Sequence, residues 1–230
     1  MATGSTIFVS VCSVLLAVSS TLCQSNIPKN PLGYVFNGGK PTAPIHLEIF
    51  ADLTCPDCQQ AWPVVKQVAE YYGPEKLRMV FQTFPLAFHT NAFIAAQSVP
   101  VAECFNSSLV FAWIDVLFKN QNLLYNFQTL DKNRFDINNI IASLAPKAGI
   151  SQSAMKSGLS EASPERQAII SWKHGCSKTV SGTPTFFIND VLVSEASSTW
   201  TIDQWKKLID SILEHELDKI VLERHSKKTK

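Results

Sequence analysis

The chain has 230 residues, a net charge of +1 and 46% hydrophobic residues. A chain of this length can bury one hydrophobic core, or one domain that carries a sizeable insertion, so two independent domains are not expected. Its Lys and Arg residues are scattered, which argues against the basic surface of a nucleic-acid-binding protein. The only basic run lies in the tail 223–230, where we expect a solvated chain end.

Residues 1–23 have the pattern of a signal peptide. The apolar run from Ile7 to Val18 is too short to cross a bilayer as a helix, but it suits the core of a signal peptide, although no Lys or Arg precedes it. No later segment is apolar enough to span a membrane, and the C-terminus carries no lumenal retention signal. We therefore predict a mature chain without a membrane span that is secreted, lumenal in the secretory pathway, or exported by a bacterium.

The first half of the mature chain has a β-α-β pattern. Residues 24–44 are rich in Pro and Gly and predict an extended lead-in with turns. A strand is predicted from Ile45 to Phe50, and a helix from about Pro56 to Tyr72, with Gly73-Pro74 ending it. Leu77 to Thr83 is predicted to be a second strand, parallel to the first.

Residues 89–178 then change to helical spacing of the hydrophobic positions, which predicts a helical block. Within it, one helix is expected to begin with Ser163 as its cap and Pro164 at its first position.

Strand patterns return after this block. Two strands, Thr185–Ile188 and Val191–Val193, flank a predicted turn at Asn189-Asp190, and an amphipathic helix follows from about Ile202 to Leu222. The predicted fold class is therefore α/β: a thioredoxin fold in the order β-α-β … β-β-α, interrupted by a helical insertion. Its thioredoxin-fold part would comprise residues 45–88 and 179–222, with the insertion at 89–178.

Four of the six cysteines lie beyond the predicted signal peptide: Cys55, Cys58, Cys104 and Cys176. An even number in an exported protein fits an oxidising compartment. The Cys55-Pro56-Asp57-Cys58 motif is compatible with redox chemistry and with zinc binding. A structural zinc site needs four ligands, and the other close pair of Cys and His residues, His174 and Cys176, lacks the usual ligand spacing. We therefore favour a redox-active cysteine pair over a zinc site.

The position of the motif supports thiol chemistry. A strand-to-helix turn offers free backbone amides and the positive end of the helix dipole, which together stabilise a thiolate at Cys55. Cys58 lies one helical turn later, within reach of a disulfide with Cys55.

The segment from Phe50 to Cys58 resembles the active-site region of DsbA-like thiol oxidoreductases, and the resemblance extends from about Ile45 to Leu213. Further segments that match this family in order are Pro63, Phe84-Pro85-Leu86, His89, Ala95-Ala96, Phe111–Gln121 and Gly182–Asn189. The resemblance implies that Pro184 is a cis-proline facing the disulfide and that the backbone of Thr183 pairs with an extended substrate. The sequence by itself leaves a trans-proline at the start of an edge strand equally open.

Three polar residues near the motif have alternative roles. Glu48, in an otherwise apolar strand, could be held near neutral pKa and relay a proton to Cys58, or could lie at a strand end and reach solvent. Asp52 is expected to cap the turn before Cys55 rather than act as an acid. For His89, a structural hydrogen bond is favoured over a contact with the reacting groups.

We predict from these features a protein thiol-disulfide oxidoreductase acting on polypeptides that contain cysteines. Cys55 would form the mixed disulfide and Cys58 would resolve it, in a monomer that needs no metal, nucleotide or flavin but does need a redox partner of unknown identity. The alternative is a non-catalytic peptide-binding module with a permanent disulfide. A reductase or isomerase would run the same chemistry in another direction, and a glutathione-conjugating relative is disfavoured because it needs no resolving cysteine.

Two further expectations concern individual residues. A structural disulfide between Cys104 and Cys176 would tie the insertion to the core, with two buried free thiols as the alternative. Pro56 and Asp57 are expected to tune the redox potential. The DsbA-like family usually carries His where this chain has Asp57, and a carboxylate disfavours the Cys55 thiolate, so a weaker oxidant is expected.

Overall fold

The computed structural model describes residue 28 and residues 30–214. The predicted signal peptide, the basic tail and the last part of the predicted final helix lie outside these residues. The described residues from Leu32 onward belong to one compact unit, separate from a unit that ends at Pro31. Over the described ranges, no helix is both long enough and apolar enough to cross a membrane.

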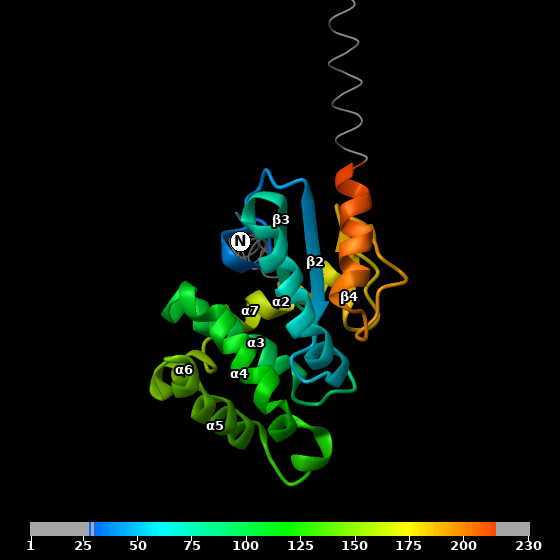
Figure 1. Ribbon diagram of the computed structural model, residues 1–230. Helices are drawn as coiled ribbons and strands as arrows, with labels where there is room; N and C mark the ends of the chain where they lie inside the picture. Colours follow the sequence, from blue (N-terminus) through cyan, green and yellow to red (C-terminus); the bar gives the residue numbers. More distant parts are fainter. Residues whose placement is uncertain (1–27, 29, 215–230) are drawn as a thin grey trace, which may run out of the picture. The chain divides into compact units, whose positions relative to one another are not determined.

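The core of the fold is a five-stranded mixed sheet with the order β1-β3-β2-β4-β5. Strands β2, β3 and β4 of this sheet are labelled in Figure 1. The central strand β2 (Ile45–Ala51) runs parallel to β3 (Leu77–Thr83) and antiparallel to β4 (Thr185–Ile188). The edge strand β5 (Val191–Leu192) pairs antiparallel with β4. These strands are placed as the sequence predicts, including the parallel β2–β3 pair.

The other edge strand, β1 (Tyr34–Val35), lies inside the predicted lead-in and pairs antiparallel with β3. This two-residue strand is not predicted from the sequence, because the surrounding Pro and Gly residues indicate turns rather than a strand. Gly33 is required just before it, because its φ is +92° and a Cβ there would collide with the side chains of Val80 and Gln82. A short 3-10 turn, η1 (Phe36–Gly38), follows β1.

One face of the sheet is covered by α2 (Pro56–Lys76) together with the C-terminal helix, which is helical over residues 202–214 (Figure 1). Alternation along β2 sends Ile45, Leu47 and Ile49 to this face, where they are buried. Helix α2 continues through Lys76, but Gly73 has the non-helical angles φ 70° and ψ 169°, so regular helix is interrupted where the sequence indicates.

The opposite face is covered by α7 (Ala162–Ser177), which packs on Phe50 of β2. Gly175 allows this close approach, because a Cβ at this position would lie 2.4 Å from the Phe84 ring. The predicted start of α7 is wrong: the helix begins at Ala162 with Glu161 in the N-cap position and no side-chain cap bond, so Ser163 is already helical.

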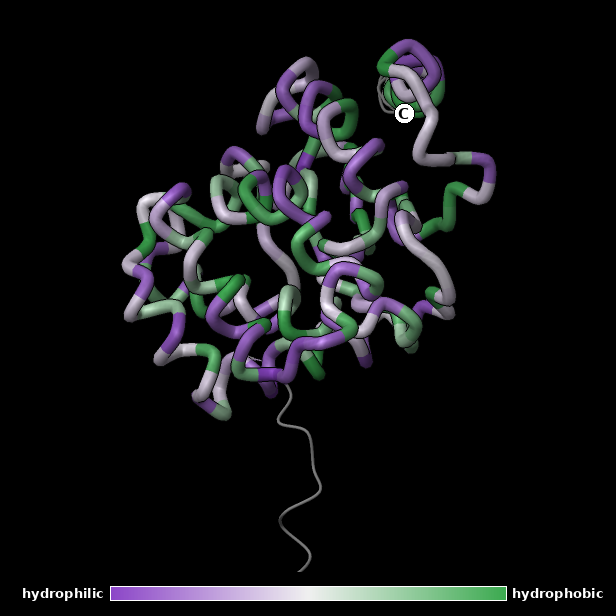
Figure 2. Tube along the Cα trace, turned by 90° about the horizontal axis from the view of Figure 1, so that it is seen from below, coloured by the Kyte–Doolittle hydropathy of each residue, from purple (hydrophilic) through white to green (hydrophobic). Residues whose placement is uncertain are grey.

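The remaining helices all fall between β3 and β4 in the sequence and group together (Figure 1). They are α3 (Ala92–Phe105), α4 (Val110–Asn120), α5 (Arg134–Leu144) and α6 (Gln152–Gly158), with 3-10 turns η2 (Ser107–Leu109), η3 (Gln121–Leu124), η4 (Asn126–Gln128) and η5 (Ala145–Ala148). Hydrophobic and hydrophilic residues are mixed along the trace of the protein (Figure 2). The helix α3 is an exception among these helices, because its residues from Ile94 to Ala102 are all buried. The limits 89 and 178 of a separate insertion stay a prediction.

The turn between β4 and β5 is formed by Asn189 and Asp190, both with positive φ (48° and 66°). Two successive left-handed residues are typical of the tight hairpin that these residue types predict. The Asn189 side chain also bonds the backbone of His46 and Pro44, which fixes the hairpin against the start of β2.

Candidate active site

The Cys55–Cys58 motif lies at the turn between β2 and α2. Cys55 is the N-cap of α2 and Pro56 occupies its first position. The buried Asp52 carboxylate holds this turn, because one oxygen accepts bonds from the backbone and hydroxyl of Thr54 at 2.7 Å each. Its other oxygen accepts from the Leu86 amide at 2.9 Å and bonds His89 Nδ1 at 2.8 Å. The structural roles expected for Asp52 and His89 are therefore confirmed.

The two sulfurs are in different environments. Cys55 exposes 5% of its surface and Cys58 none, so Cys55 alone of the pair retains an opening to solvent. The hydrogen bond from Cys58, together with the backbone amides of Cys58 and Asp57, outweighs burial and lowers the pKa of Cys55 to about 6. Burial, followed by the bond to Cys55 and the charge of that thiolate, raises the pKa of Cys58 well above its ordinary value.

The loop before β4 closes the site from the other side. The peptide bond between Thr183 and Pro184 is cis, as the family resemblance implies. The Cys55 sulfur lies 3.5 Å from the carbonyl oxygen of Thr183. The structure thus brings together four of the predicted site residues, Cys55, Cys58, Thr183 and Pro184, from segments about 125 residues apart.

The Thioredoxin_4 family model, described as thioredoxin, matches residues 34–211, which is most of the chain. The chain belongs to the thioredoxin family.

Solved structures agree with this thioredoxin-family assignment at the level of the fold. A variant of alpha-DsbA1 from Wolbachia pipientis matches with a TM-score of 0.65 and 20% identity, covering 85% of this chain and 96% of that one. BdbD from Bacillus subtilis in its oxidised form gives 0.62 and 18%, with 79% and 93% covered. A thioredoxin-like oxidoreductase from Silicibacter pomeroyi gives 0.61 and 16%, with 80% and 94% covered. A comparison with curated protein sequences finds no significant match.

The predicted fold class and the resemblance to DsbA-like proteins are thereby confirmed for this thioredoxin-family protein. The roles of its individual site residues still rest on the geometry described above.

The expectation for Glu48 is not met by the structure. Burial raises the pKa of Glu48, but hydrogen bonds from His174, Lys178 and Gln82 outweigh it and lower the pKa to about 2. Lys178 Nζ lies 2.7 Å from one carboxylate oxygen, and Gln82 Nε2 lies 2.8 Å from the other. Glu48 is therefore an ionised carboxylate that links β2 to α7 on the sheet face opposite α2, and neither a neutral proton relay nor a solvent-exposed strand end describes it.

The Cys104–Cys176 disulfide predicted for this thioredoxin-family protein is absent from the structure, where both cysteines are free and exposed. Cys104 lines a hollow with Glu161 and Pro164 at the beginning of α7, whereas Cys176 lies at the end of the same helix. Twelve helical residues separate Pro164 from Cys176, which corresponds to about 18 Å along the axis at 1.5 Å per residue. Cys104 therefore lies near one end of α7 and Cys176 at the other, whereas a disulfide needs Cα atoms within about 7 Å of each other.

Two residues beside Cys55 were not predicted from the sequence. The buried amide of Gln121 contacts the backbone of Leu53 and Cys55, and the Tyr125 hydroxyl lies 3.2 Å from that amide. Burial raises the pKa of Tyr125, and the charge of Cys55 raises it further. Gln121 begins η3 and Tyr125 lies between η3 and η4, and nothing in their local sequence marks them as close to the motif.

Two exposed aromatic rings lie near Tyr125, on the loops that contain Phe88 and Phe127. Phe88 and Phe127 expose 67% and 68% of their surfaces, and the Phe127 ring lies 5.7 Å from that of Tyr125. The Asn126 side chain joins the two loops, donating to the Phe88 carbonyl at 2.8 Å and accepting from the Thr90 amide. We call Phe88, Tyr125 and Phe127 the aromatic surface.

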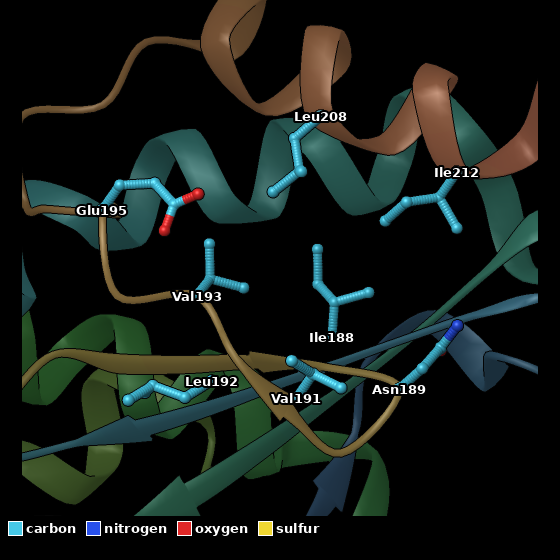
Figure 3. A pocket seen from close by; sticks show the side chains of 8 residues that line it. All are labelled: Ile188, Asn189, Val191, Leu192, Val193, Glu195, Leu208 and Ile212. Atoms are coloured by element: carbon cyan, nitrogen blue, oxygen red, sulfur yellow. The ribbon is translucent and has the colours of Figure 1, made fainter.

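A pocket of about 370 Å³ lies elsewhere, between the β4–β5 hairpin and the C-terminal helix (Figure 3). Its walls are apolar, with Val191 and Leu192 on one side and Leu208 and Ile212 on the other, and it includes none of the predicted site residues. In the part of the chain that the structure describes, no three His, Cys, Asp or Glu side chains come together as metal ligands would.

Proposed function

We propose that this protein is a thiol-disulfide oxidoreductase that uses Cys55 and Cys58 on polypeptides of an exported or secretory-pathway compartment. The observation that carries the proposal is the pairing of an activated Cys55, at the N-terminus of α2, with a fully buried Cys58 whose thiol donates to it. This asymmetry is what stepwise thiol exchange requires, because one sulfur must attack or leave easily and the other must act second.

In the oxidising direction, a substrate thiolate attacks the Cys55 sulfur of the Cys55–Cys58 disulfide. A mixed disulfide with Cys55 forms and the Cys58 sulfur leaves. A second substrate thiolate then attacks its own partner sulfur and expels Cys55 as a thiolate, so the substrate loses two electrons and the Cys pair gains them. The low pKa of Cys55 makes it a good leaving group in this step. A redox partner would restore the disulfide.

The aromatic surface supports polypeptide substrates. The exposed rings of Phe88 and Phe127 lie close to Tyr125, which contacts the active-site turn through Gln121, and they can bind apolar side chains that an incompletely folded chain still exposes. The Thr183 backbone lies beside Cys55, where an extended substrate segment can pair with it. The signal-peptide pattern of residues 1–23 supports an exported location, and one structural relative is described as a periplasmic thioredoxin-like protein from Salmonella enterica.

The direction of the reaction is tested by the redox equilibrium with glutathione. We expect a potential between about −120 mV, the value of the strong oxidant DsbA, and about −270 mV, that of thioredoxin. A potential below about −300 mV would instead support the non-catalytic alternative, in which the disulfide is permanent. The measurement uses the purified full chain and follows the Cys55–Cys58 disulfide by mass spectrometry after acid quenching.

Asp57 is expected to weaken the oxidising power. Its carboxylate is exposed, with Ser198 Oγ at 3.2 Å, so solvent screening limits its effect on the Cys55 thiolate. Replacing Asp57 with His should lower the pKa of Cys55 and make the potential less negative, since a negative charge is exchanged for a donor. Asp203→His removes another exposed carboxylate, in the first turn of the C-terminal helix, and serves as the matched control. An unchanged or more negative potential for Asp57→His would show that this residue does not set the redox balance.

A further inference from the structure

Gln121 forms a polar contact between the helical segment and the active-site turn. Its side chain is almost fully buried, with 1% exposed. On one side its amide meets only carbonyl oxygens, those of Leu53 at 3.3 Å and Cys55 at 3.2 Å. On the other side it meets the Tyr125 hydroxyl at 3.2 Å and the side-chain oxygen of Gln59 at 2.9 Å. With its nitrogen toward the carbonyls, the amide donates to both of them and its oxygen accepts from Tyr125, with one oxygen–oxygen contact to Gln59. The opposite orientation would set the amide oxygen against two carbonyl oxygens, so the first orientation is favoured.

The two carbonyl groups that Gln121 binds lie on both sides of the reactive cysteine. The Leu53 carbonyl belongs to the peptide unit before Thr54, and the Cys55 carbonyl belongs to the peptide unit that leads into Pro56. One buried amide thus fixes the backbone before and after the Cys55 Cα atom. Because the Cys55 carbonyl also accepts the Gln59 amide at 3.1 Å, this position is held by α2 and by Gln121 together.

The direction of this backbone determines which groups face the sulfur. Pro56 has no amide hydrogen, so the first free donors of α2 are the amides of Asp57 and Cys58. Those two amides are the backbone groups that stabilise the Cys55 thiolate. Their aim depends on the extended conformation of Cys55, with φ −82° and ψ 124°, which a rotation of its carbonyl would change.

We propose that Gln121 is a positioning residue for the redox pair: it fixes the Leu53 and Cys55 carbonyls and so keeps the Asp57 and Cys58 amides directed at the Cys55 sulfur. This inference rests on the proposed function of Cys55 as the reactive thiol. Tyr125, which belongs to the aromatic surface, bonds the same amide, so the segment that would meet a substrate also holds the residue that positions the sulfur.

The test replaces Gln121 with Met, an unbranched side chain of similar length that lacks the amide. The thiolate fraction of Cys55 is measured by its ultraviolet absorbance against pH in the reduced protein, with Cys55→Ser as the blank. We expect the pKa of Cys55 to rise by about one, the scale of losing one set of aligned donors to a charged group.

Gln97→Met is the matched control. Gln97 is equally buried in the same helical segment, where its amide donates to the Leu159 carbonyl at 3.0 Å and accepts from Arg134. Its loss should destabilise the protein without moving the pKa of Cys55. Equal shifts in both variants would mean general loosening of the helices and would overturn the proposal, as would an unchanged pKa in Gln121→Met.

Tyr125→Phe provides a second variant in case Gln121→Met does not fold. It keeps the ring and removes only the hydroxyl that orients the amide, so a smaller rise of the Cys55 pKa is expected, and no rise would count against the proposal. The proposed function is tested separately by the unsubstituted protein. If its Cys55 pKa is not lowered, the proposed role of Cys55 fails; if it is lowered but does not respond to Gln121, only the positioning role fails.

Discussion

Replacing Cys58 with Ser should convert the protein into a trap that accumulates mixed disulfides through Cys55 and no longer turns over. The Cys55 thiolate, still activated by the Asp57 amide and the N-terminus of α2, attacks a disulfide of a substrate and displaces one of its two sulfurs. Cys58, which would attack this mixed disulfide and release the substrate, is gone. Serine is the suitable substitute because its hydroxyl can still donate to the thiolate, as the buried Cys58 thiol does. Catalysed oxidation of a reduced polypeptide should fall to the uncatalysed rate.

The trapping experiment needs a background without Cys104 and Cys176, because both are exposed free thiols that could form adducts of their own. In that background, Cys55→Ser should trap nothing, and the protein with both active-site cysteines should keep full activity. Adducts are identified by non-reducing electrophoresis and mass spectrometry. If Cys55→Ser traps as well as Cys58→Ser, the roles assigned to the two sulfurs are reversed.

The second large effect is the pH dependence of Cys55. With a pKa of about 6 instead of the ordinary 9.0, Cys55 is half ionised at pH 6, where an ordinary thiol is ionised to about one part in a thousand. Its alkylation by iodoacetamide should therefore be half-maximal near pH 6 and level above pH 7. The same residue in the denatured chain should still be gaining reactivity at pH 8.

A less basic thiolate is also a weaker nucleophile, so the midpoint of the profile is the decisive quantity rather than the absolute rate. Peptide mass spectrometry separates Cys55 from Cys58, which should remain unmodified across this range because burial keeps it protonated. A midpoint for Cys55 near pH 8 or above would contradict the activation described for this site.

The same shift makes stability depend on pH. A lowered pKa in the folded state stabilises the reduced protein fully above the ordinary value of 9.0, and this contribution is lost as the pH falls towards 6. Reduced protein should therefore resist urea better at pH 8 than at pH 6. Oxidised protein, which has no titrating Cys55 thiol, should lack this part of the difference and is the internal control.

The sequence by itself predicts the fold well because its signals are local. Alternating and helical spacing place β2, β3 and β4, Pro56 marks the start of α2, and Asn189-Asp190 predicts the hairpin turn. The redox motif is equally local, since two cysteines one helical turn apart at a strand-to-helix turn lie within reach of a disulfide. The two-residue strand β1 gives too short a pattern to be detected.

Only the tertiary structure determines the properties that depend on contacts between segments far apart in the sequence. The spacing of residues along the chain cannot show that Cys104 and Cys176 lie near opposite ends of α7. An even number of cysteines therefore does not suffice to predict a disulfide between them. The apolar strand around Glu48 suggests a buried acid of near-neutral pKa. Its ionisation depends instead on hydrogen bonds from His174 and Lys178, which lie more than 120 residues later in the chain. For the same reason Gln121 is invisible in the sequence: a glutamine amide gains a role beside Cys55 only when the fold brings the two backbone segments together.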